Sequence, residues 1–175
     1  MRWRRLGSRR LAHCRVFDVD EVEFAPPDGR PAASFFVIDS PDWVNVIPLT
    51  ADRQVLMVRQ YRFGIDELTL EIPGGMCDAG EPPLEAARRE LREETGHEAS
   101  EWVDLGWVHP NPALQVNRCH TFLARGLQRV SEPQPDPYEA FEHVSVALAE
   151  VPQLIRERRI THALVVAAFQ LLTSA

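Results

Sequence analysis

Residues 75–98 read GMCDAGEPPLEAARRELREETGHE, and they form the most informative stretch of the chain. Glu81-Pro82-Pro83 predicts the start of a helix, because proline fits the first turn, where its missing N–H is no loss. Gly96 predicts the end of that helix, since glycine is the usual left-handed C-terminal cap. Together these signals predict a helix from about Pro83 to Thr95.

Carboxylates gather on one face of this predicted helix. On a repeat of about 3.6 residues, an apolar stripe is formed by Leu84, Ala87 and Leu91. The neighbouring face carries Ala86, Glu90, Glu93, Glu94 and His97. Like charges four residues apart cost a helix roughly 0.2–0.5 kcal/mol per pair. We therefore expect a cation to lie among the three glutamates of this face.

The chemistry of the cluster indicates which cation to expect. Carboxylate oxygens without His or Cys suit Mg²⁺ or Mn²⁺, which in turn suit phosphate oxygens. Pro73-Gly74-Gly75 lacks side-chain bulk, so backbone groups there can approach a metal or a diphosphate. Arg89, four residues before Glu93, can hold that carboxylate in place. A solvated acidic helix face after a glycine turn is the alternative interpretation.

The spacing of these residues carries a family resemblance. Gly75 is followed after five residues by Glu81, and after seven more by Arg89-Glu90-Leu91-x-Glu93-Glu94-x-Gly96. This pattern resembles the signature of the Nudix hydrolases. His97 departs from it, because the family usually has an aliphatic residue at this position. That position is one of packing, so the departure concerns local packing more than chemistry.

Motifs outside the signature resemble one branch of the family. They are Val58-Arg59-Gln60-Tyr61-Arg62, Glu71-Ile72-Pro73-Gly74-Gly75, and Pro112, sixteen residues after Gly96. These motifs are similar to those of ADP-ribose pyrophosphatases and related nucleoside diphosphate sugar hydrolases. The resemblance covers nearly the whole chain. It implies an α/β fold, a Nudix-type α/β/α sandwich with a mixed sheet and a small N-terminal β region.

The resemblance also implies roles for single residues. Metal binding is implied for Glu90, Glu94, Glu93 and the carbonyl of Gly74, with Glu93 either a further ligand or a base. A supporting catalytic role is implied for Arg89 together with Glu81. Substrate contacts are implied for Arg62, Glu71 and Pro112, although Arg62 has the alternative of only closing a sheet edge. The expected general base is a glutamate of the loop 131–142, either Glu139 or Glu142, with Glu142 favoured because it adjoins a predicted strand.

Patterns elsewhere predict more strands and two C-terminal helices. Alternation of apolar and polar residues predicts an N-terminal hairpin made by residues 14–24 and 33–38. Further strands are predicted at 43–49, 54–62, 68–73, 102–109, 117–124 and 143–148, and helices at 151–158 and 161–172. We expect an N-terminal β region over residues 1–40 and a Nudix hydrolase domain over residues 41–175. By resemblance, the N-terminal region would help to build a homodimer.

Composition limits the partners and the compartment. The formal net charge of −7 argues against a general nucleic-acid binder. The three cysteines, Cys14, Cys77 and Cys119, form no CxxC pair, so neither a disulfide framework nor a zinc site is predicted. The reducing cytoplasm is therefore the expected compartment. No stretch approaches the roughly 20 apolar residues of a membrane span.

These expectations together describe an enzyme. It would use Mg²⁺, or alternatively Mn²⁺, to hydrolyse the diphosphate linkage of ADP-ribose or a related nucleoside diphosphate sugar. The products would be a nucleoside monophosphate and a sugar phosphate. Two alternatives remain: a pyrophosphohydrolase of nucleoside triphosphates or dinucleoside polyphosphates, and a non-catalytic sensor of ADP-ribose or another nucleotide. The full set of carboxylates weighs against the sensor.

Overall fold

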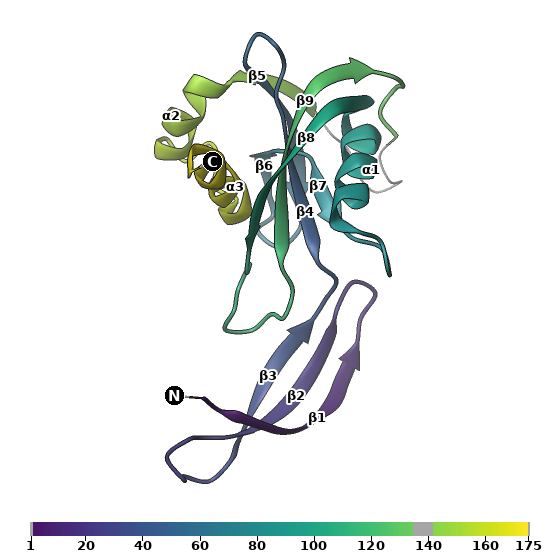
Figure 1. The fold of residues 1–175 in the computed structure, drawn as a ribbon. Helices are drawn as coiled ribbons and strands as arrows, with labels where there is room; N and C mark the ends of the chain where they lie inside the picture. The colour runs from purple at the N-terminus through teal and green to yellow at the C-terminus, as the bar shows by residue number, and fades with distance from the viewer. Residues whose placement is uncertain (1, 135–141, 175) are drawn as a thin grey trace. The chain divides into compact units, whose positions relative to one another are not determined.

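The computed structural model describes residues 2–134 and 142–174 (Figure 1). Contacts within the chain divide it into two compact units. One unit comprises Met1–Pro41 with His109–Arg118, and the other comprises Asp42–Val108 with Cys119–Ala175. The first unit therefore includes a loop that lies far from the N-terminal region in sequence.

The N-terminal unit contains a three-stranded antiparallel sheet in the order β1-β2-β3. Its strands are β1 (Arg4–His13), β2 (Asp18–Ala25) and β3 (Ala33–Asp39). The predicted hairpin corresponds to β2 and β3. Strand β1 was not predicted, because its arginine-rich sequence lacks an apolar alternation and all its residues are exposed. It forms through pairing with β2, where Arg10 lies opposite Asp20 and its side chain donates to that carboxylate.

The second unit contains two sheets. Their orders are β7-β4-β9-β8 and β10-β5-β6. The strands are β4 (Trp43–Pro48), β5 (Gln54–Arg62), β6 (Glu67–Glu71), β7 (Gly74–Met76), β8 (His97–Val108), β9 (Cys119–Arg129) and β10 (Glu142–Ala147). Strands β4 and β9 are parallel, and the other pairs are antiparallel. The predicted mixed sheet is thus confirmed.

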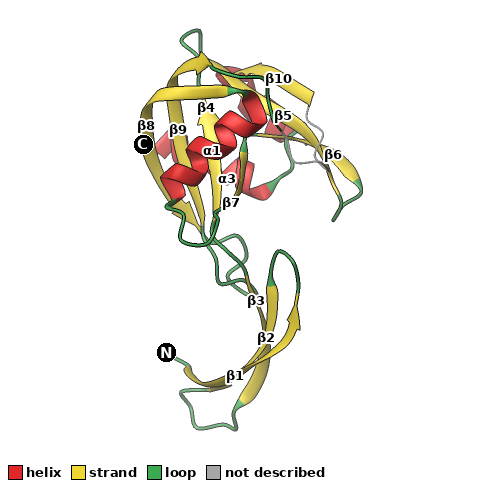
Figure 2. Ribbon diagram, turned by 90° about the vertical axis from the view of Figure 1, so that its right-hand side faces the viewer, coloured by secondary structure: helices red, strands yellow, loops and turns green. Residues whose placement is uncertain are grey.

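Helices cover both sides of these strands. They are α1 (Pro83–Thr95), the short 3-10 turn η1 (Leu148–Glu150), α2 (Val151–Arg156) and α3 (Ala163–Ser174). In Figures 1 and 2, α1 lies on one side of the strands, and Figure 1 shows α2 and α3 on the other. Helix α1 has the bounds that the sequence predicts, and Gly96 caps it with a φ of 71°. The layered α/β architecture expected from the sequence is confirmed.

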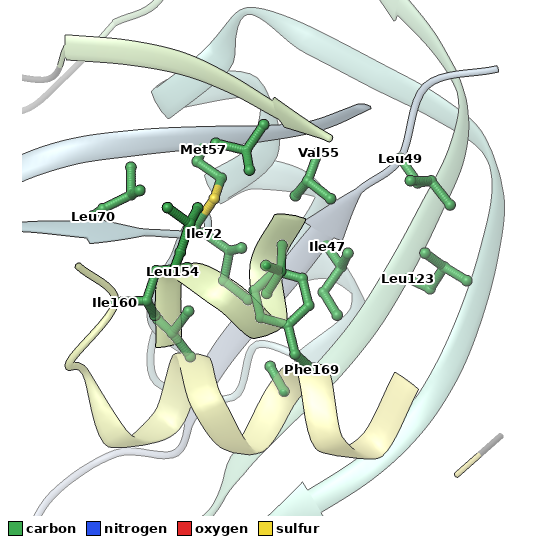
Figure 3. Close-up of a cluster of buried hydrophobic side chains, with 14 residues drawn as sticks. Ile47, Leu49, Val55, Met57, Leu70, Ile72, Leu123, Leu154, Ile160 and Phe169 are labelled. Atoms are coloured by element: carbon green, nitrogen blue, oxygen red, sulfur yellow. The ribbon is translucent and has the colours of Figure 1, made fainter. Parts of the chain in front are cut away.

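Strand β4 separates two hydrophobic cores. Alternate residues of a strand point to opposite faces of its sheet. Val44 and Val46 accordingly pack with Leu91 of α1, whereas Ile47 packs in the core that contains Phe169 of α3 (Figure 3). This division fixes α1, and the acidic residues that it carries, against one face of the sheet.

No helix in the described part of the chain has the length and apolar character needed to cross a membrane.

Candidate active site

Arg89 connects three acidic side chains of the candidate site. Its guanidinium donates to both carboxylate oxygens of Glu81, at 3.1 and 2.9 Å. One of its nitrogens, Nη1, donates to Glu90 at 2.8 Å and to Glu93 at 3.2 Å. The other, Nη2, also donates to the backbone carbonyl of Met76 at 2.9 Å. Arg89 therefore ties the loop before α1 to the second half of the helix.

The charges of this cluster stabilise one another. The hydrogen bonds from Arg89 hold the pKa of Glu81 below its ordinary value, and they outweigh the opposing effect of burial. Glu81 raises the pKa of Arg89 in return, with further contributions from Glu90 and Glu93. In this structure, the cation between Glu90 and Glu93 is Arg89 itself.

Two glycines of β7 allow the backbone to approach these side chains. A Cβ atom on Gly75 would lie 2.2 Å from Oε1 of Glu90. A Cβ atom on Gly74 would lie 2.2 Å from the carbonyl oxygen of Val44, its neighbour on β4. A side chain is therefore excluded at Gly74, which meets backbone, whereas one at Gly75 would displace the carboxylate of Glu90, which packs directly against the backbone of β7.

The three glutamates of α1 differ in their surroundings. Glu94 is buried, with 4% of its surface exposed, whereas the side chain of Glu93 is 45% exposed. Among residues 2–134 and 142–174, no three His, Cys, Asp or Glu side chains are gathered closely enough to hold a metal ion as they stand. The predicted convergence of Glu90, Glu93 and Glu94 on one point is thus not seen. The physical reason is that Arg89 holds the carboxylates of Glu90 and Glu93 through hydrogen bonds, while Glu94 is buried and Glu93 is half-exposed.

The donor atoms nevertheless suit a divalent cation. The carboxylates of Glu90 and Glu94 are hard oxygen ligands, and so is the predicted carbonyl ligand of Gly74. The close approach of Glu90 to the backbone of β7 adds to this fit, because a side chain on Gly75 would displace that carboxylate. The residues present therefore fit Mg²⁺ or Mn²⁺.

Arg62 and Glu71 form a second charged group, on β5 and β6. Arg62 donates to both oxygens of Glu71, at 2.7 and 2.6 Å. Thr69 also donates to Glu71, at 2.5 Å. Burial raises the pKa of Glu71, but these hydrogen bonds outweigh that effect and lower it overall. Glu71 is only 2% exposed, so its position suits orienting Arg62 better than contacting a substrate directly.

The predicted general bases lie in different settings. Glu142 is the first residue of β10 rather than a loop residue, and its carboxylate accepts from Arg59 at 2.7 Å. Its neighbour His143 reaches α1, where Nε2 donates to the backbone carbonyl of Glu94 at 2.6 Å. Because neighbouring residues of a strand point to opposite faces, Glu142 is directed away from α1. This placement weighs against Glu142 as the base.

The predicted roles of Glu139 and Pro112 are not tested by the contacts described above. Glu139 lies outside the described residues. Pro112 belongs to the loop His109–Arg118 of the N-terminal unit. Their predicted roles remain predictions.

Comparison with protein families finds one family model that matches most of the chain. The NUDIX domain matches residues 40–169. The chain belongs to the Nudix family. The resemblance inferred from the spacing between Gly75 and Gly96 is thereby confirmed, and so is the prediction of a hydrolytic enzyme of this family.

Individual relatives of this Nudix chain match most of its length. An ADP-ribose pyrophosphatase of Bacillus subtilis is 31% identical over 170 residues, which are 95% of this chain and 90% of that protein. A methanol dehydrogenase activator of Bacillus methanolicus is 33% identical over 155 residues, 88% of this chain and 82% of the relative. A crystal structure of an ADP compounds hydrolase has a TM-score of 0.87, with 24% identity and coverage of 99% and 94% of the two chains. The structural likeness shows the shared fold.

Two contacts of this Nudix site escaped the sequence analysis. Helical periodicity pairs Arg89 with Glu93, but its two hydrogen bonds to Glu81 span eight residues, and Glu81 precedes the helix. The bond from His143 to Glu94 joins residues 49 positions apart. No local pattern contains either contact, because both depend on how the loop and the strand return to α1.

Proposed function

We propose that this Nudix enzyme hydrolyses the diphosphate linkage of ADP-ribose or a related nucleoside diphosphate sugar. The proposal rests chiefly on the cluster that Arg89 builds, because Arg89 fixes Glu81, which precedes α1, together with Glu90 and Glu93 of α1, and Glu90 packs against the backbone of β7. The name of one relative that matches most of the chain, the ADP-ribose pyrophosphatase of Bacillus subtilis, supports the same substrate class. The products would be a nucleoside monophosphate and a sugar phosphate.

A divalent cation is part of the proposal, with Mg²⁺ preferred and Mn²⁺ as the alternative. Glu90, Glu94 and the carbonyl of Gly74 would hold it. A bound cation would neutralise the negative charge of the diphosphate, because that charge otherwise repels an incoming nucleophile. Arg89 keeps the Glu90 carboxylate oriented through its 2.8 Å hydrogen bond.

Glu93 is the proposed general base. Its side chain is half-exposed and is held by Arg89 at 3.2 Å, so it combines access to water with a fixed position. The carboxylate would take one proton from a water molecule whose oxygen forms the new bond to phosphorus. The P–O bond to the second phosphate then breaks, and the electron pair of that bond leaves with the departing phosphate group.

Arg62 is the proposed substrate contact outside the group of Arg89, Glu90, Glu93 and Glu94. A guanidinium presents paired donors that match phosphate oxygens. Glu71 would orient it through the two hydrogen bonds at 2.7 and 2.6 Å. Pro112 remains a proposed contact by resemblance alone.

The test is a substrate panel combined with two matched variants. The panel contains ADP-ribose, other nucleotide sugars, nucleoside triphosphates and dinucleoside polyphosphates, each with Mg²⁺ or Mn²⁺ and with products separated by chromatography. Glu94→Gln should reduce both Mg²⁺ affinity and turnover while the protein stays folded. Glu85→Gln is the control, because Glu85 lies on the same helix with its side chain half-exposed, and it should behave as wild type.

The panel also separates the alternatives. Preferred turnover of triphosphates or dinucleoside polyphosphates would replace the proposed substrate class. Binding of ADP-ribose without any turnover would favour the sensor. Calorimetry that finds unchanged metal binding in folded Glu94→Gln would remove Glu94 from the site.

We also propose that the protein is a homodimer. The N-terminal unit exposes large apolar side chains at Trp3, Leu6, Phe35 and Phe36, and the β5–β6 hairpin exposes Tyr61, Phe63, Ile65 and Leu68. Apolar surfaces of this kind are typical of contacts with another protein, and a second copy of the chain would cover them. Sedimentation of the intact protein tests this proposal, and a monomer at micromolar concentration would contradict it.

The cytoplasm is the proposed compartment. The cysteines Cys14, Cys77 and Cys119 are free thiols. Burial is the main cause that raises the pKa of Cys77 to about 11 and that of Cys119 to about 12. Both buried thiols are therefore protonated at neutral pH, which suits a structural role in a reducing compartment.

A further inference from the structure

The last turn of α1 takes hydrogen bonds from outside the helix. The final carbonyls of an α-helix have no partner within it. Here the carbonyl of Glu93 accepts from the backbone N–H of Gln134 at 2.7 Å, and the carbonyl of Glu94 accepts from Nε2 of His143 at 2.6 Å. The segments on either side of residues 135–141 thus hold the two consecutive peptide groups that carry Glu93 and Glu94.

His143 differs from the other partners of this turn. The Gln134 bond comes from a backbone N–H, and the carbonyl of Thr95 is bonded by the side chain of His97, only two residues away. His143 instead lies on β10 and reaches α1 across 49 positions of sequence. It is therefore a long-range contact that a substitution can remove without altering the chain near the helix.

The bond acts on the backbone of a residue whose side chain has little freedom. Glu94 is buried, so the direction of its carboxylate follows the orientation of the last turn. Sites that bind metal or substrate depend on supporting hydrogen bonds to hold their ligands, since a displacement of about 1 Å weakens them strongly. A donor that restrains the Glu94 carbonyl therefore restrains the carboxylates of this turn.

We propose that His143 is a positioning residue that holds the catalytic end of α1 in its binding geometry. This inference rests on the proposed function, in which Glu94 is a metal ligand and Glu93 a base. In this proposal His143 acts through the backbone carbonyl of Glu94 and is itself neither a metal ligand nor a substrate contact. A carbonyl can only accept, so Nε2 carries the hydrogen, and the role requires an N–H donor rather than a charge.

Three variants of the full chain separate positioning from simple packing. His143→Phe keeps a ring of similar size but removes the donor. His143→Gln restores an N–H at nearly the same distance from Cβ. Ser145→Ala is the matched control, because Ser145 lies two residues further along β10, on the same face, and is exposed.

The measurements are Mn²⁺ affinity by calorimetry, kcat and KM for ADP-ribose, and amide hydrogen exchange at Gly96, whose N–H donates to the carbonyl of Arg92. For His143→Phe we expect Mn²⁺ affinity and kcat to fall by roughly 3–10-fold, the effect of one hydrogen bond. Exchange at Gly96 should accelerate by a similar factor, with KM little changed. His143→Gln should return all three values to within about twofold of wild type, and Ser145→Ala should match wild type.

Several results would overturn the inference. Wild-type affinity and exchange in His143→Phe would show that the bond positions nothing. Equal losses in His143→Phe and His143→Gln would assign the effect to the imidazole as a packing group. A wild-type protein that neither binds Mn²⁺ nor hydrolyses any compound of the panel would overturn the proposed function as well, which distinguishes the two failures.

Discussion

Replacing Arg89 by Met should destabilise the protein by removing the contacts that join Glu81, Glu90 and Glu93. The variant keeps most of the aliphatic volume but removes five hydrogen bonds, four of them to carboxylates. It also leaves the negative charges of Glu81, Glu90 and Glu93 close together. Hydrogen bonds to charged groups contribute about 1.5–3 kcal/mol each when well buried.

The expected loss is smaller than the sum of these bonds. The side chain of Arg89 is partly exposed, so water compensates part of the loss, and the freed carboxylates can turn toward solvent. We expect the free energy of unfolding at pH 7 to fall by about 2–4 kcal/mol. For a chain of this length, that corresponds to a decrease in Tm of roughly 5–15 °C.

The effect should depend on pH in a defined direction. The pKa of Glu81 is lowered in the folded state by Arg89. A carboxyl group with a lowered folded pKa adds stability above its unfolded value, near 4.5, and this stability is lost as the pH falls through the folded value. The difference between wild type and Arg89→Met should therefore be full at pH 7 and shrink below about pH 4.5.

Urea and thermal unfolding at pH 7 and pH 4 provide the assay. Arg88→Met is the matched control, because Arg88 is the neighbouring arginine and makes two weaker contacts. These are a half-exposed ion pair with Glu85 at 3.5 Å and a cation–π contact with the Trp102 ring at 5.9 Å. This control should change stability by less than about 1 kcal/mol. The proposed stabilising role of Arg89 would be refuted if Arg89→Met lowered the free energy of unfolding by less than about 1 kcal/mol, or by no more than Arg88→Met does.

Three further changes test other parts of the structure. Gly75→Ala places a Cβ atom 2.2 Å from the carboxylate of Glu90, so kcat/KM should fall at least about tenfold with the fold retained, as measured by kinetics and circular dichroism; wild-type activity would contradict the close approach. Glu142→Gln should keep kcat within about threefold of wild type, whereas a loss of about 10²–10⁴-fold in steady-state assays would restore Glu142 as the base. Glu71→Gln should lower the free energy of unfolding by about 2–4 kcal/mol and raise KM through Arg62; urea unfolding and kinetics equal to wild type would contradict an orienting role.

Elements with strong local signals were predicted well from the sequence. Helix α1 has its predicted bounds because Pro83 and Gly96 act through the backbone, without help from the rest of the fold. Strand β5 also matches its predicted range, 54–62, because turn residues bound its apolar run. Strand β8 begins at His97, before the predicted start at Trp102. Its first residues are mostly exposed, so no burial pattern marked them.

The site was predicted in part. Helical spacing placed Glu93 near Arg89, because residues four positions apart lie on the same face of a helix. The same spacing treated Glu94 as equivalent to Glu93, although packing buries only Glu94. Periodicity within α1 could have distinguished them, because Glu94 lies three residues after the buried Leu91 and continues the apolar stripe of the helix, whereas Glu93 does not.

The alternation of β4 has a consequence for how this fold tolerates changes in chain length. Val44 and Val46 belong to one core, and Ile47 belongs to the other. Inserting or deleting one residue within β4 would exchange the faces of every residue that follows. Asn45, whose side chain donates to the carbonyl of Leu164 at 3.1 Å, would then lose that partner and enter the apolar layer beneath α1. Natural length variation and engineered insertions should therefore occur at the turns that flank β5, at residues 50–53 and 63–66, and spare β4.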